Sequence, residues 1–290
     1  MPTIERLSAL EILDSRGRPT VQATCILQSG AVGTASVPSG ASTGRAEARE
    51  LRDGDARRYG GLGCRKAVAN VAGEICQAVR GRHFADQAML DEFLRMLDGT
   101  PDKGRLGANA ILAASLSFAR AAAKAKGAPL YAYFAELTGT TPTLPGLTVN
   151  LFSGGKHAGG QVEIQDVLLA PRTAATIDEA LAMVYAVYQA AASLCHDKYG
   201  MRALSADEGG LAPPFLDVDA MLSDAVQAIE RAGLQPGHEI ALAVDVAASH
   251  FYMDGCYHLG HERLASHEMI ARILTWLDRY PILSVEDGLA

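Results

Sequence analysis

The hydrophobic pattern of residues 239–249 predicts a strand that is buried on both faces. Apolar side chains alternate with alanines from Ile240 to Val244, and the run ends at Asp245. A near-continuous apolar run of this length is typical of a strand in a parallel sheet that helices cover. An acid at the end of such a strand is costly to bury unless a cation or hydrogen-bond donors satisfy it.

A second stretch of the same kind follows after a predicted helix. Residues 281–285 are mostly apolar and lead into Glu286. Capping of the next helix or turn would explain one such acid, but two acids at the ends of two buried strands favour a shared ligand. The pattern therefore predicts a β/α barrel with a divalent metal at its C-terminal rim, where one strand ends at Asp245 and the other at Glu286 and Asp287.

The first part of the chain predicts a small antiparallel meander followed by helices. Within residues 3–37, apolar and polar side chains alternate, and a Gln-Ser-Gly turn separates two of the runs. Apolar residues at helical spacing then predict helices over 66–80, 86–97, 109–126 and 130–137. Strands followed by helices indicate an α+β domain, which we place at residues 1–140.

A threonine- and proline-rich segment at 138–145 is predicted to link this domain to a second one at 146–290. The second domain opens with apolar runs at 147–152 and 162–170, and their short glycine-rich connection indicates antiparallel strands. Later elements are helices over 176–198, 219–231 and 267–279 and a hairpin over 251–259. Thr176 and Glu179 form a capping box at the start of the first helix. The chain is therefore predicted to be an α/β protein whose second domain contains four barrel strands.

The composition excludes several classes of function. The net charge is −7, so the chain offers no basic stripe for nucleic-acid phosphates. No apolar run approaches the roughly 20 residues that span a bilayer, and the N-terminus does not resemble a signal peptide. The cysteines are odd in number and lack C-x-x-C spacing, which indicates reduced thiols rather than disulfides or a zinc site. We expect a cytoplasmic protein.

Polar residues in otherwise apolar or glycine-rich surroundings are the candidates for a site. Gln165 and Asp166 interrupt a predicted buried strand and need partners, which a substrate could provide. Glu208 lies before two glycines, so a backbone turn could present it to a ligand. His157 lies in a glycine-rich loop near the same place, although a lone histidine is more often a surface or packing residue.

Two further features remain open at this point. Residues 38–44 are small and flexible, which is typical either of a surface loop or of a mobile flap with the Ser42 hydroxyl at its centre. His258, His261 and His267 lie around the predicted hairpin and the start of the next helix, and we assign them no role.

Seven motifs along the chain resemble the enolase family. They are PSGASTG, LRDGD, LDGTPDKGRLGANAIL, GGKHAGG, DEGG, DVAAS and SVEDG, and they occur in the family's order and approximate spacing over essentially the whole chain. The resemblance implies an α+β cap domain followed by a β/α barrel that begins with two antiparallel strands. It also implies Mg²⁺-dependent dehydration of 2-phosphoglycerate to phosphoenolpyruvate, a small phosphorylated carboxylate as substrate, and a dimer.

The resemblance also implies roles for individual residues. Asp245 and Glu286 match two acidic metal ligands, and Ser42 matches the flap serine that binds a second metal. Glu208 matches the general acid that assists departure of the hydroxyl group. His157, Gln165 and Asp166 match substrate-side positions; Asp166 is counted with Glu208 as catalytic. Cations on the substrate oxygens fit this chemistry, because the proton next to a carboxylate is barely acidic.

The substrate-side positions depart from the family pattern. Asp166 stands where enolases carry glutamate, which shortens its reach by roughly 1.5 Å. Misplacement on this scale can cost about a hundredfold in rate. Gly160, Phe152, Ser153, Pro214 and His250 also replace more usual residues. The pattern fits either a divergent enolase or a paralogue that acts on a related phospho- or phosphono-carboxylate, such as a carboxyphosphonoenolpyruvate synthase.

An enolase barrel continues beyond the SVEDG strand. The resemblance implies that those later strands carry the remaining acidic ligand, the lysine base and the phosphate-binding residues. We therefore expect residues 1–290 alone to be a poor catalyst, whether the chain is a truncated product, is completed by a second polypeptide, or has other chemistry. A non-catalytic enolase-like role is the alternative. Uncovered strand edges are expected to favour a homodimer or higher self-association.

Overall fold

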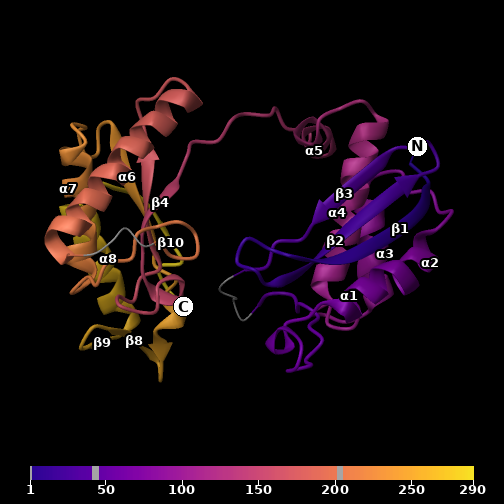
Figure 1. Ribbon diagram of the computed structural model, residues 1–290, viewed down its shortest axis with the longest axis horizontal. Coiled ribbons are helices and arrows are strands. Elements are labelled where there is room, and N and C mark those ends of the chain that lie inside the picture. The colour runs from indigo at the N-terminus through magenta and orange to yellow at the C-terminus, as the bar shows by residue number, and fades with distance from the viewer. Residues whose placement is uncertain (1, 41–45, 201–204) are drawn as a thin grey trace. The chain divides into compact units, whose positions relative to one another are not determined.

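The computed structural model describes residues 2–40, 46–200 and 205–290 (Figure 1). The chain forms two compact units, Met1–Thr143 and Leu144–Ala290. The predicted loop serine, Ser42, lies outside the described residues. No helix in the described part of the chain is long and apolar enough to cross a membrane.

The N-terminal unit contains the predicted three-stranded antiparallel meander. Its strands are β1 (Ile4–Leu13), β2 (Pro19–Leu27) and β3 (Val32–Ser36), in the order β1-β2-β3. Alternate side chains of β2 are buried beneath α4 (Ala108–Ala125), as the alternation in the sequence requires. The neighbouring strand β3 approaches α4 closely at Gly33, where a Cβ would lie 2.2 Å from Ala121 N.

The helices of this unit follow the apolar periodicity. The remaining ones are α1 (Arg65–Asn70), α2 (Cys76–Val79), α3 (Gln87–Asp98) and α5 (Leu130–Thr138), with a 3₁₀ turn, η1 (Tyr59–Gly61). The helix predicted at 66–80 is one run in which a π-helical turn, η2 (Val71–Ile75), joins α1 to α2. Periodicity does not reveal this turn, because a single extra residue shifts the apolar face only slightly.

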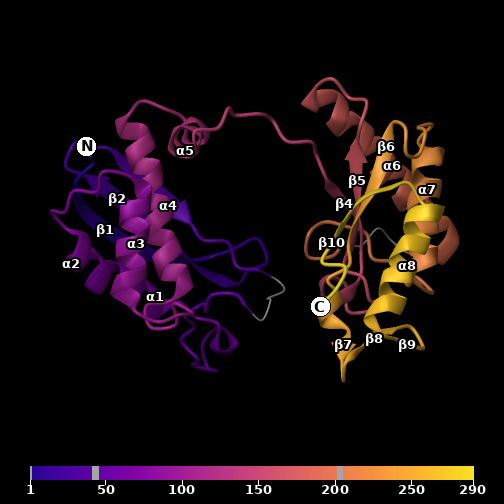
Figure 2. The same ribbon diagram turned by 180° about the vertical axis from the view of Figure 1, so that it is seen from behind.

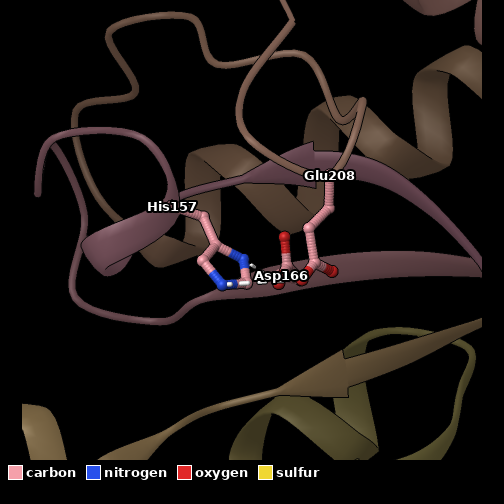
Figure 3. Close-up of side chains that lie close together, drawn as sticks. All are labelled: His157, Asp166 and Glu208. Atoms are coloured by element: carbon pink, nitrogen blue, oxygen red, sulfur yellow. Dashed lines mark hydrogen bonds and ion pairs between the residues drawn. The ribbon is translucent and has the colours of Figure 1, made fainter. Parts of the chain in front are cut away.

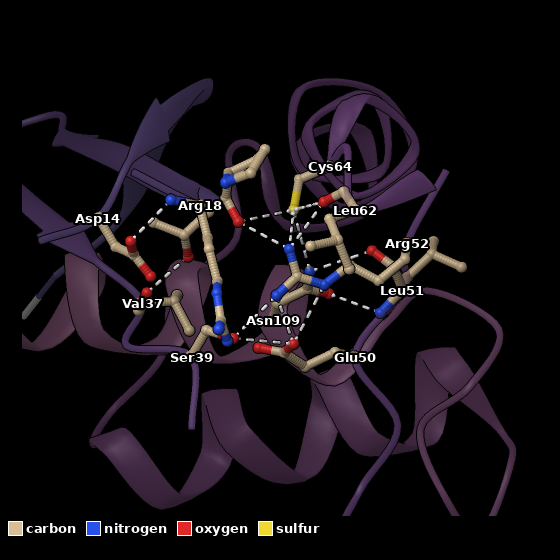
Figure 4. Close-up of polar contacts among 12 residues, drawn as sticks. Asp14, Arg18, Val37, Ser39, Glu50, Leu51, Arg52, Leu62, Cys64 and Asn109 are labelled. Atoms are coloured by element: carbon tan, nitrogen blue, oxygen red, sulfur yellow. Dashed lines mark hydrogen bonds and ion pairs between the residues drawn. The ribbon is translucent and has the colours of Figure 1, made fainter. Parts of the chain in front are cut away.

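A partly buried arginine, Arg52, holds the irregular segment between β3 and α1 in place. Arg52 donates to the carbonyl oxygens of Pro19 and Leu62 at 2.7 and 2.8 Å, and to Ser39 Oγ and Glu50 Oε2 at 2.8 and 2.6 Å (Figure 4). A planar guanidinium with five donors suits such a junction, where several loop carbonyls need partners. The contacts tie the segment to the start of β2.

The C-terminal unit contains a four-stranded sheet in the order β10-β6-β5-β4 (Figure 2). Its strands are β4 (Val149–Ser153), β5 (Asp166–Pro171), β6 (Ile240–Asp245) and β10 (Ile282–Glu286). The pairs β4–β5 and β5–β6 are antiparallel, and β6–β10 is parallel. The predicted antiparallel opening of this domain is therefore present.

Three helices pack on one face of this sheet: α6 (Ile177–Tyr199), α7 (Val218–Arg231) and α8 (Ser266–Arg279) (Figures 1 and 2). On β6, Ile240, Leu242 and Val244 enter the core that the helices share. Because side chains alternate along a strand, Asp245 belongs to the opposite face. The unit also contains 3₁₀ turns η3 (Gly155–His157) and η4 (Ala248–His250) and a small sheet of β7 (Tyr252–Met253), β8 (Cys256–Leu259) and β9 (Glu262–Leu264).

The strand predicted at 162–170 begins later than its apolar run. Residues 161–164 form bends, and β5 starts at Asp166. The glycine-rich loop holds the bends in place, because Gly154 N donates to Gln165 O and Gly155 N donates to Val162 O at 2.7 and 2.8 Å. The prediction that Gln165 and Asp166 interrupt the middle of a strand was therefore wrong. Gln165 directly precedes β5, and Asp166 is its first residue.

Candidate active site

The strand register places four polar residues in one row across the C-terminal sheet. Ser153 pairs with Asp166, Asp166 with Asp245, and Asp245 with Glu286. Residues directly opposite each other in neighbouring strands project to the same face of a sheet. The row lies at the C-terminal ends of β6 and β10, which is the edge where open and closed α/β sheets bind ligands.

Asp245 and Glu286 form an acidic pair at this edge. Asp245 Oδ1 accepts a hydrogen bond from Ala247 N at 3.1 Å, and the backbone at Val246 donates to Glu286 O at 3.0 Å. Burial raises the pKa of Asp245, and the neighbouring charge of Asp245 raises the pKa of Glu286. Two carboxylates that repel each other at a partly buried edge offer only oxygen ligands, which suit a hard divalent cation such as Mg²⁺.

Gln165 joins this pair to the rest of the site. Its Nε2 donates to Asp245 Oδ2 at 2.9 Å, and its backbone N donates to Asp245 O at 3.0 Å. Gln165 is buried, and its Oε1 has no hydrogen-bond partner within the described part of the chain. The amide therefore fixes the rotamer of Asp245 and leaves one buried acceptor for a ligand or a water molecule.

A second cluster lies beside the first and consists of His157, Asp166 and Glu208 (Figure 3). His157 Nδ1 lies 2.9 Å from Asp166 Oδ2, and His157 Nε2 lies 3.8 Å from Glu208 Oε1. Ser153 Oγ donates to the other carboxylate oxygen of Asp166 at 2.6 Å. The imidazole thus stands between a buried carboxylate and a more exposed one, which is an arrangement that can hold and pass a proton.

Burial dominates the electrostatics of this cluster. It raises the pKa of Asp166 to about 6, against the opposing effects of the Ser153 hydrogen bond and of His157. The side chain of Glu208 is 43% exposed, and Asn150 Nδ2 donates to its Oε2 at 3.2 Å. A carboxyl group that titrates near neutral pH beside a histidine is suited to acid–base chemistry.

The described ligand atoms of His157, Asp166 and Glu208 lie within 4.8 Å of one another, so this cluster is also a formal candidate for a metal. The contact between His157 Nδ1 and Asp166 Oδ2 already occupies one atom of each residue. Their geometry is therefore that of a hydrogen-bonded chain, and the acidic pair is the better cation site.

Two family models match the chain. The first, described as "Enolase, N-terminal domain", matches residues 4–134, and the second, "Enolase, C-terminal TIM barrel domain", matches residues 141–290. The chain belongs to the enolase family. This confirms both the family and the fold class predicted from the sequence.

Six of the seven predicted site residues of this enolase-family chain lie together at one edge of the C-terminal sheet. They are His157, Gln165, Asp166, Glu208, Asp245 and Glu286. The seventh, Ser42, falls on a part of the chain that the structure does not describe. The roles of all seven stay predictions, since the positions of side chains do not by themselves assign a function to any of them.

Sequence reasoning assigned no role to Ser153 and Asn150. Both come from β4 and contact a predicted acid, Ser153 at Asp166 and Asn150 at Glu208. The position of Ser153 could have been predicted in part from the sequence. A short connection between antiparallel strands brings the end of the first opposite the start of the second, and Ser153 and Asp166 occupy those ends.

Proposed function

We propose that this chain is a Mg²⁺-dependent lyase of the enolase type, and that its first candidate reaction is dehydration of 2-phosphoglycerate to phosphoenolpyruvate. The observation that carries the proposal is the row of carboxylates Asp166, Asp245 and Glu286, with His157 and Glu208 beside it. Membership of the enolase family supports the same chemistry.

In this proposal Asp245 and Glu286 hold the cation. When bound, Mg²⁺ would supply positive charge near the carboxylate oxygens of the substrate, where negative charge would develop as the neighbouring proton passes to a base. The resemblance to enolases assigns that base, a lysine, to the later barrel strands. Gln165 would keep Asp245 in its ligating orientation through the 2.9 Å hydrogen bond. Its Oε1 has no hydrogen-bond partner among the described residues and would accept a hydrogen bond from a substrate hydroxyl group or from water.

Glu208 is the proposed general acid for the departing hydroxyl group. Its carboxyl group is the exposed member of the His157 cluster and can therefore reach a substrate. His157, held by Asp166 on its other nitrogen, stands near enough to exchange a proton with Glu208 after small movements of either side chain. Asp166 thus orients the imidazole.

A related phospho- or phosphono-carboxylate is the second candidate substrate. The specific observation is that both carboxylate oxygens of Asp166 are engaged within the protein, one by Ser153 and one by His157. A short, fully engaged side chain leaves the substrate-side wall recessed compared with a glutamate. This favours a ligand whose shape or charge differs from that of 2-phosphoglycerate.

Metal binding can be measured on the chain directly, because the proposed ligands Asp245 and Glu286 are both present in it. We expect Mg²⁺ to raise the melting temperature of the purified chain, and D245N to raise the concentration needed for this effect by roughly tenfold or more. D278N is the matched control, because Asp278 is an exposed acid on α8. A Mg²⁺ response that D245N leaves unchanged would remove Asp245 from the site.

Turnover distinguishes the candidate substrates. Phosphoenolpyruvate formation from 2-phosphoglycerate, or product formation from a phosphonate analogue, would identify the reaction. We expect E208Q to abolish turnover while the Mg²⁺ response persists, since Glu208 supplies the proton and does not hold the metal. A protein that responds to neither Mg²⁺ nor these substrates would be a non-catalytic enolase-like protein.

Self-association is proposed alongside the lyase activity. Leu274 and Leu283 on α8 and β10 are 55% and 59% exposed, and β10 is an edge strand of the sheet. Exposed apolar side chains beside an unpaired strand edge favour association. Sedimentation velocity over a range of concentrations tests this, and a monomer at the highest concentration would contradict it.

A further inference from the structure

A cavity of about 440 Å³ lies between α7, α8, the β8–β9 turn and the segment that precedes β5 (these elements are labelled in Figure 2). Three buried apolar side chains line it, those of Val162, Val218 and Leu259. Gly260 N donates to Glu163 Oε1 at 2.7 Å, which joins the β8–β9 turn to the segment before β5. Arg279 of α8 donates to Asp219 of α7 at 2.6 Å. The cavity is therefore enclosed by segments that are bonded to one another.

Trp276 on α8 lines the cavity and carries a polar group that the protein leaves unsatisfied. The side chain is 2% exposed, yet its Nε1 has no hydrogen-bond partner within the described part of the chain. An indole nitrogen is a donor only, so it needs an acceptor. Buried polar groups in folded proteins are nearly always hydrogen-bonded. A molecule that enters the cavity can supply the missing acceptor.

Gln161 supplies the complementary group in the same lining. Its Nε2 donates to Ser153 O at 2.9 Å and lies 3.5 Å from Pro213 O. Because both of these partners are carbonyl oxygens, the amide nitrogen must face them, which fixes the orientation of the side chain. The Oε1 atom of Gln161 is buried and has no partner among the residues that the structure describes. The lining thus offers one donor and one acceptor to a ligand.

The lining also has an excess of negative charge. It contains four carboxylates, one guanidinium and one imidazole, from Glu163, Asp217, Asp219, Glu262, Arg272 and His261. Arg272 pairs with Glu262, whereas Glu163 and Asp217 pair with no cation in the described part of the chain. Asp217 and Asp219 stand at the start of α7, where they already balance the positive end of the helix dipole. The charge of the lining therefore disfavours an anion and favours a cation.

We propose that this cavity binds a small amphipathic amine that carries a hydroxyl group. The ammonium group faces the unpaired acids Glu163 and Asp217, and the apolar body lies against the buried side chains. A hydroxyl group both donates and accepts, so it can bond to Trp276 Nε1 or to Gln161 Oε1. Apolar walls with a few polar groups are typical of small-molecule sites. The proposal does not rest on the lyase function, because the substrates considered there are anions.

Trp276 is the single tryptophan of the chain, so its indole N–H reports on this cavity alone. Tyramine is the probe, because it joins a phenol to an ammonium group. In a proton–nitrogen correlation spectrum, we expect titration with tyramine to move the indole cross-peak. The expected Kd is about 1 mM or tighter, which about ten non-hydrogen atoms can supply. A cross-peak that tyramine leaves in place would mean that the cavity holds water only, and would overturn the proposal.

Two relatives of tyramine separate the contributions. Phenethylamine lacks the hydroxyl group, and we expect it to bind roughly three- to tenfold more weakly, which is the effect of one hydrogen bond. Para-hydroxyphenylpropionate carries a carboxylate in place of the ammonium group, and we expect it to bind at least roughly tenfold more weakly. Equal affinity of phenethylamine would overturn the role of the open donor and acceptor. Equal affinity of the carboxylate would overturn the choice of a cation.

E163Q tests the charge of the lining in the protein itself. The glutamine oxygen can still accept the hydrogen bond from Gly260 N, so the variant removes the charge and keeps the contact. We expect it to weaken tyramine binding by roughly threefold and to narrow the difference between tyramine and the carboxylate. E230Q is the matched control, since Glu230 is an exposed acid near the C-terminal end of α7 and does not line the cavity. Equal effects of the two variants would indicate attraction to the whole acidic chain and would overturn the site.

W276F tests the open donor. It keeps an aromatic ring in the wall and removes the N–H group, and tyramine binding is then followed through saturation transfer to the protons of tyramine. We expect binding to weaken by roughly three- to tenfold, the effect of one hydrogen bond. Unchanged affinity in a folded W276F would remove Trp276 from the site. Thermal melting shows whether W276F folds, and E163Q decides the proposal where it does not.

Discussion

Asp166 of β5 lies directly opposite Asp245 of β6 in an antiparallel pair. One strand begins where the other ends, so each brings its acid to the same edge of the sheet. Burial is the largest cause of the raised pKa of each carboxyl group. The Gln165 amide binds Asp245, while Ser153 and His157 bind Asp166, so the two acids are held by separate partners. Asp245 is thereby placed to hold the proposed cation, while Asp166 contacts His157.

The pH dependence of stability should reveal the buried Asp166. Its pKa is about 6 in the folded chain, against 3.8 for the ordinary group. Between these values the folded state binds more protons than the unfolded state, so this group's contribution to stability falls as pH rises through about 6. In D166N that loss is absent. The free energy of unfolding of D166N relative to that of the wild type should therefore rise by up to about 3 kcal/mol between pH 4 and pH 7.

Urea unfolding of both proteins at several pH values, with EDTA present throughout, measures this difference. D178N is a useful control because Asp178 is exposed in the first turn of α6. A difference between D166N and wild type that stays constant from pH 4 to pH 7 would contradict the assignment.

The helix boundary at α6 offers a test of local structure. Thr176 Oγ1 accepts a hydrogen bond from Glu179 N at 3.2 Å, and Glu179 Oε2 accepts one from Thr176 N at 3.2 Å. This is the capping box that the sequence predicted. T176A should lower the free energy of unfolding by about 1 kcal/mol, because it leaves a helix N–H without its cap. T173A, at an exposed position before the helix, should change it little.

Elements with a regular pattern were predictable, and the points where two segments meet were less so. Asp245 and Glu286 could be found because each ends a run of apolar residues, and the parallel register then pairs them. The start of β5 was misjudged, because apolar and polar residues alternate over 162–165 as they would in a strand. The carbonyl oxygens of Val162 and Gln165 instead accept hydrogen bonds from Gly155 N and Gly154 N. That competition depends on a neighbouring loop, which periodicity does not describe.

The contact of Ser153 with Asp166 was also hard to predict, because it too depends on a neighbouring segment of the chain. A serine at the end of a strand carries no signal by itself, and its importance comes from the residue that the antiparallel pairing places opposite it.

Close packing of β3 on α4 should make Gly33 intolerant of any side chain. A Cβ at this position would lie 2.2 Å from Ala121 N and 2.3 Å from Ser117 O, both backbone atoms that cannot turn aside. G33A should therefore lower the free energy of unfolding by about 3 kcal/mol or more. G73A is the matched control, since nothing lies within 4 Å of its added methyl group. If urea denaturation shows that G33A and G73A change the free energy of unfolding equally, β3 and α4 do not pack this closely.

Removal of the Ser153 hydroxyl should have an effect that depends on pH. Its Oγ is buried and donates to Asp166 Oδ1 at 2.6 Å, and this hydrogen bond opposes the rise in the pKa of Asp166. S153A should therefore raise that pKa further. Above pH 6 the mutant must bury an ionised oxygen that has lost its donor, at a cost of about 1 to 3 kcal/mol. Below pH 5 the carboxyl group is largely neutral in both proteins, so the cost should shrink.

S117A is the control for this last experiment. Ser117 is also buried, but its Oγ donates to the carbonyl oxygen of Ala114 at 3.0 Å, which does not titrate. Its effect on the free energy of unfolding should be the same at pH 5 and pH 7.5. Parallel pH dependence in S153A and S117A would mean that the Ser153 hydroxyl does not act on the charge of Asp166. A dependence confined to S153A would connect the end of β4 to the protonation of the site.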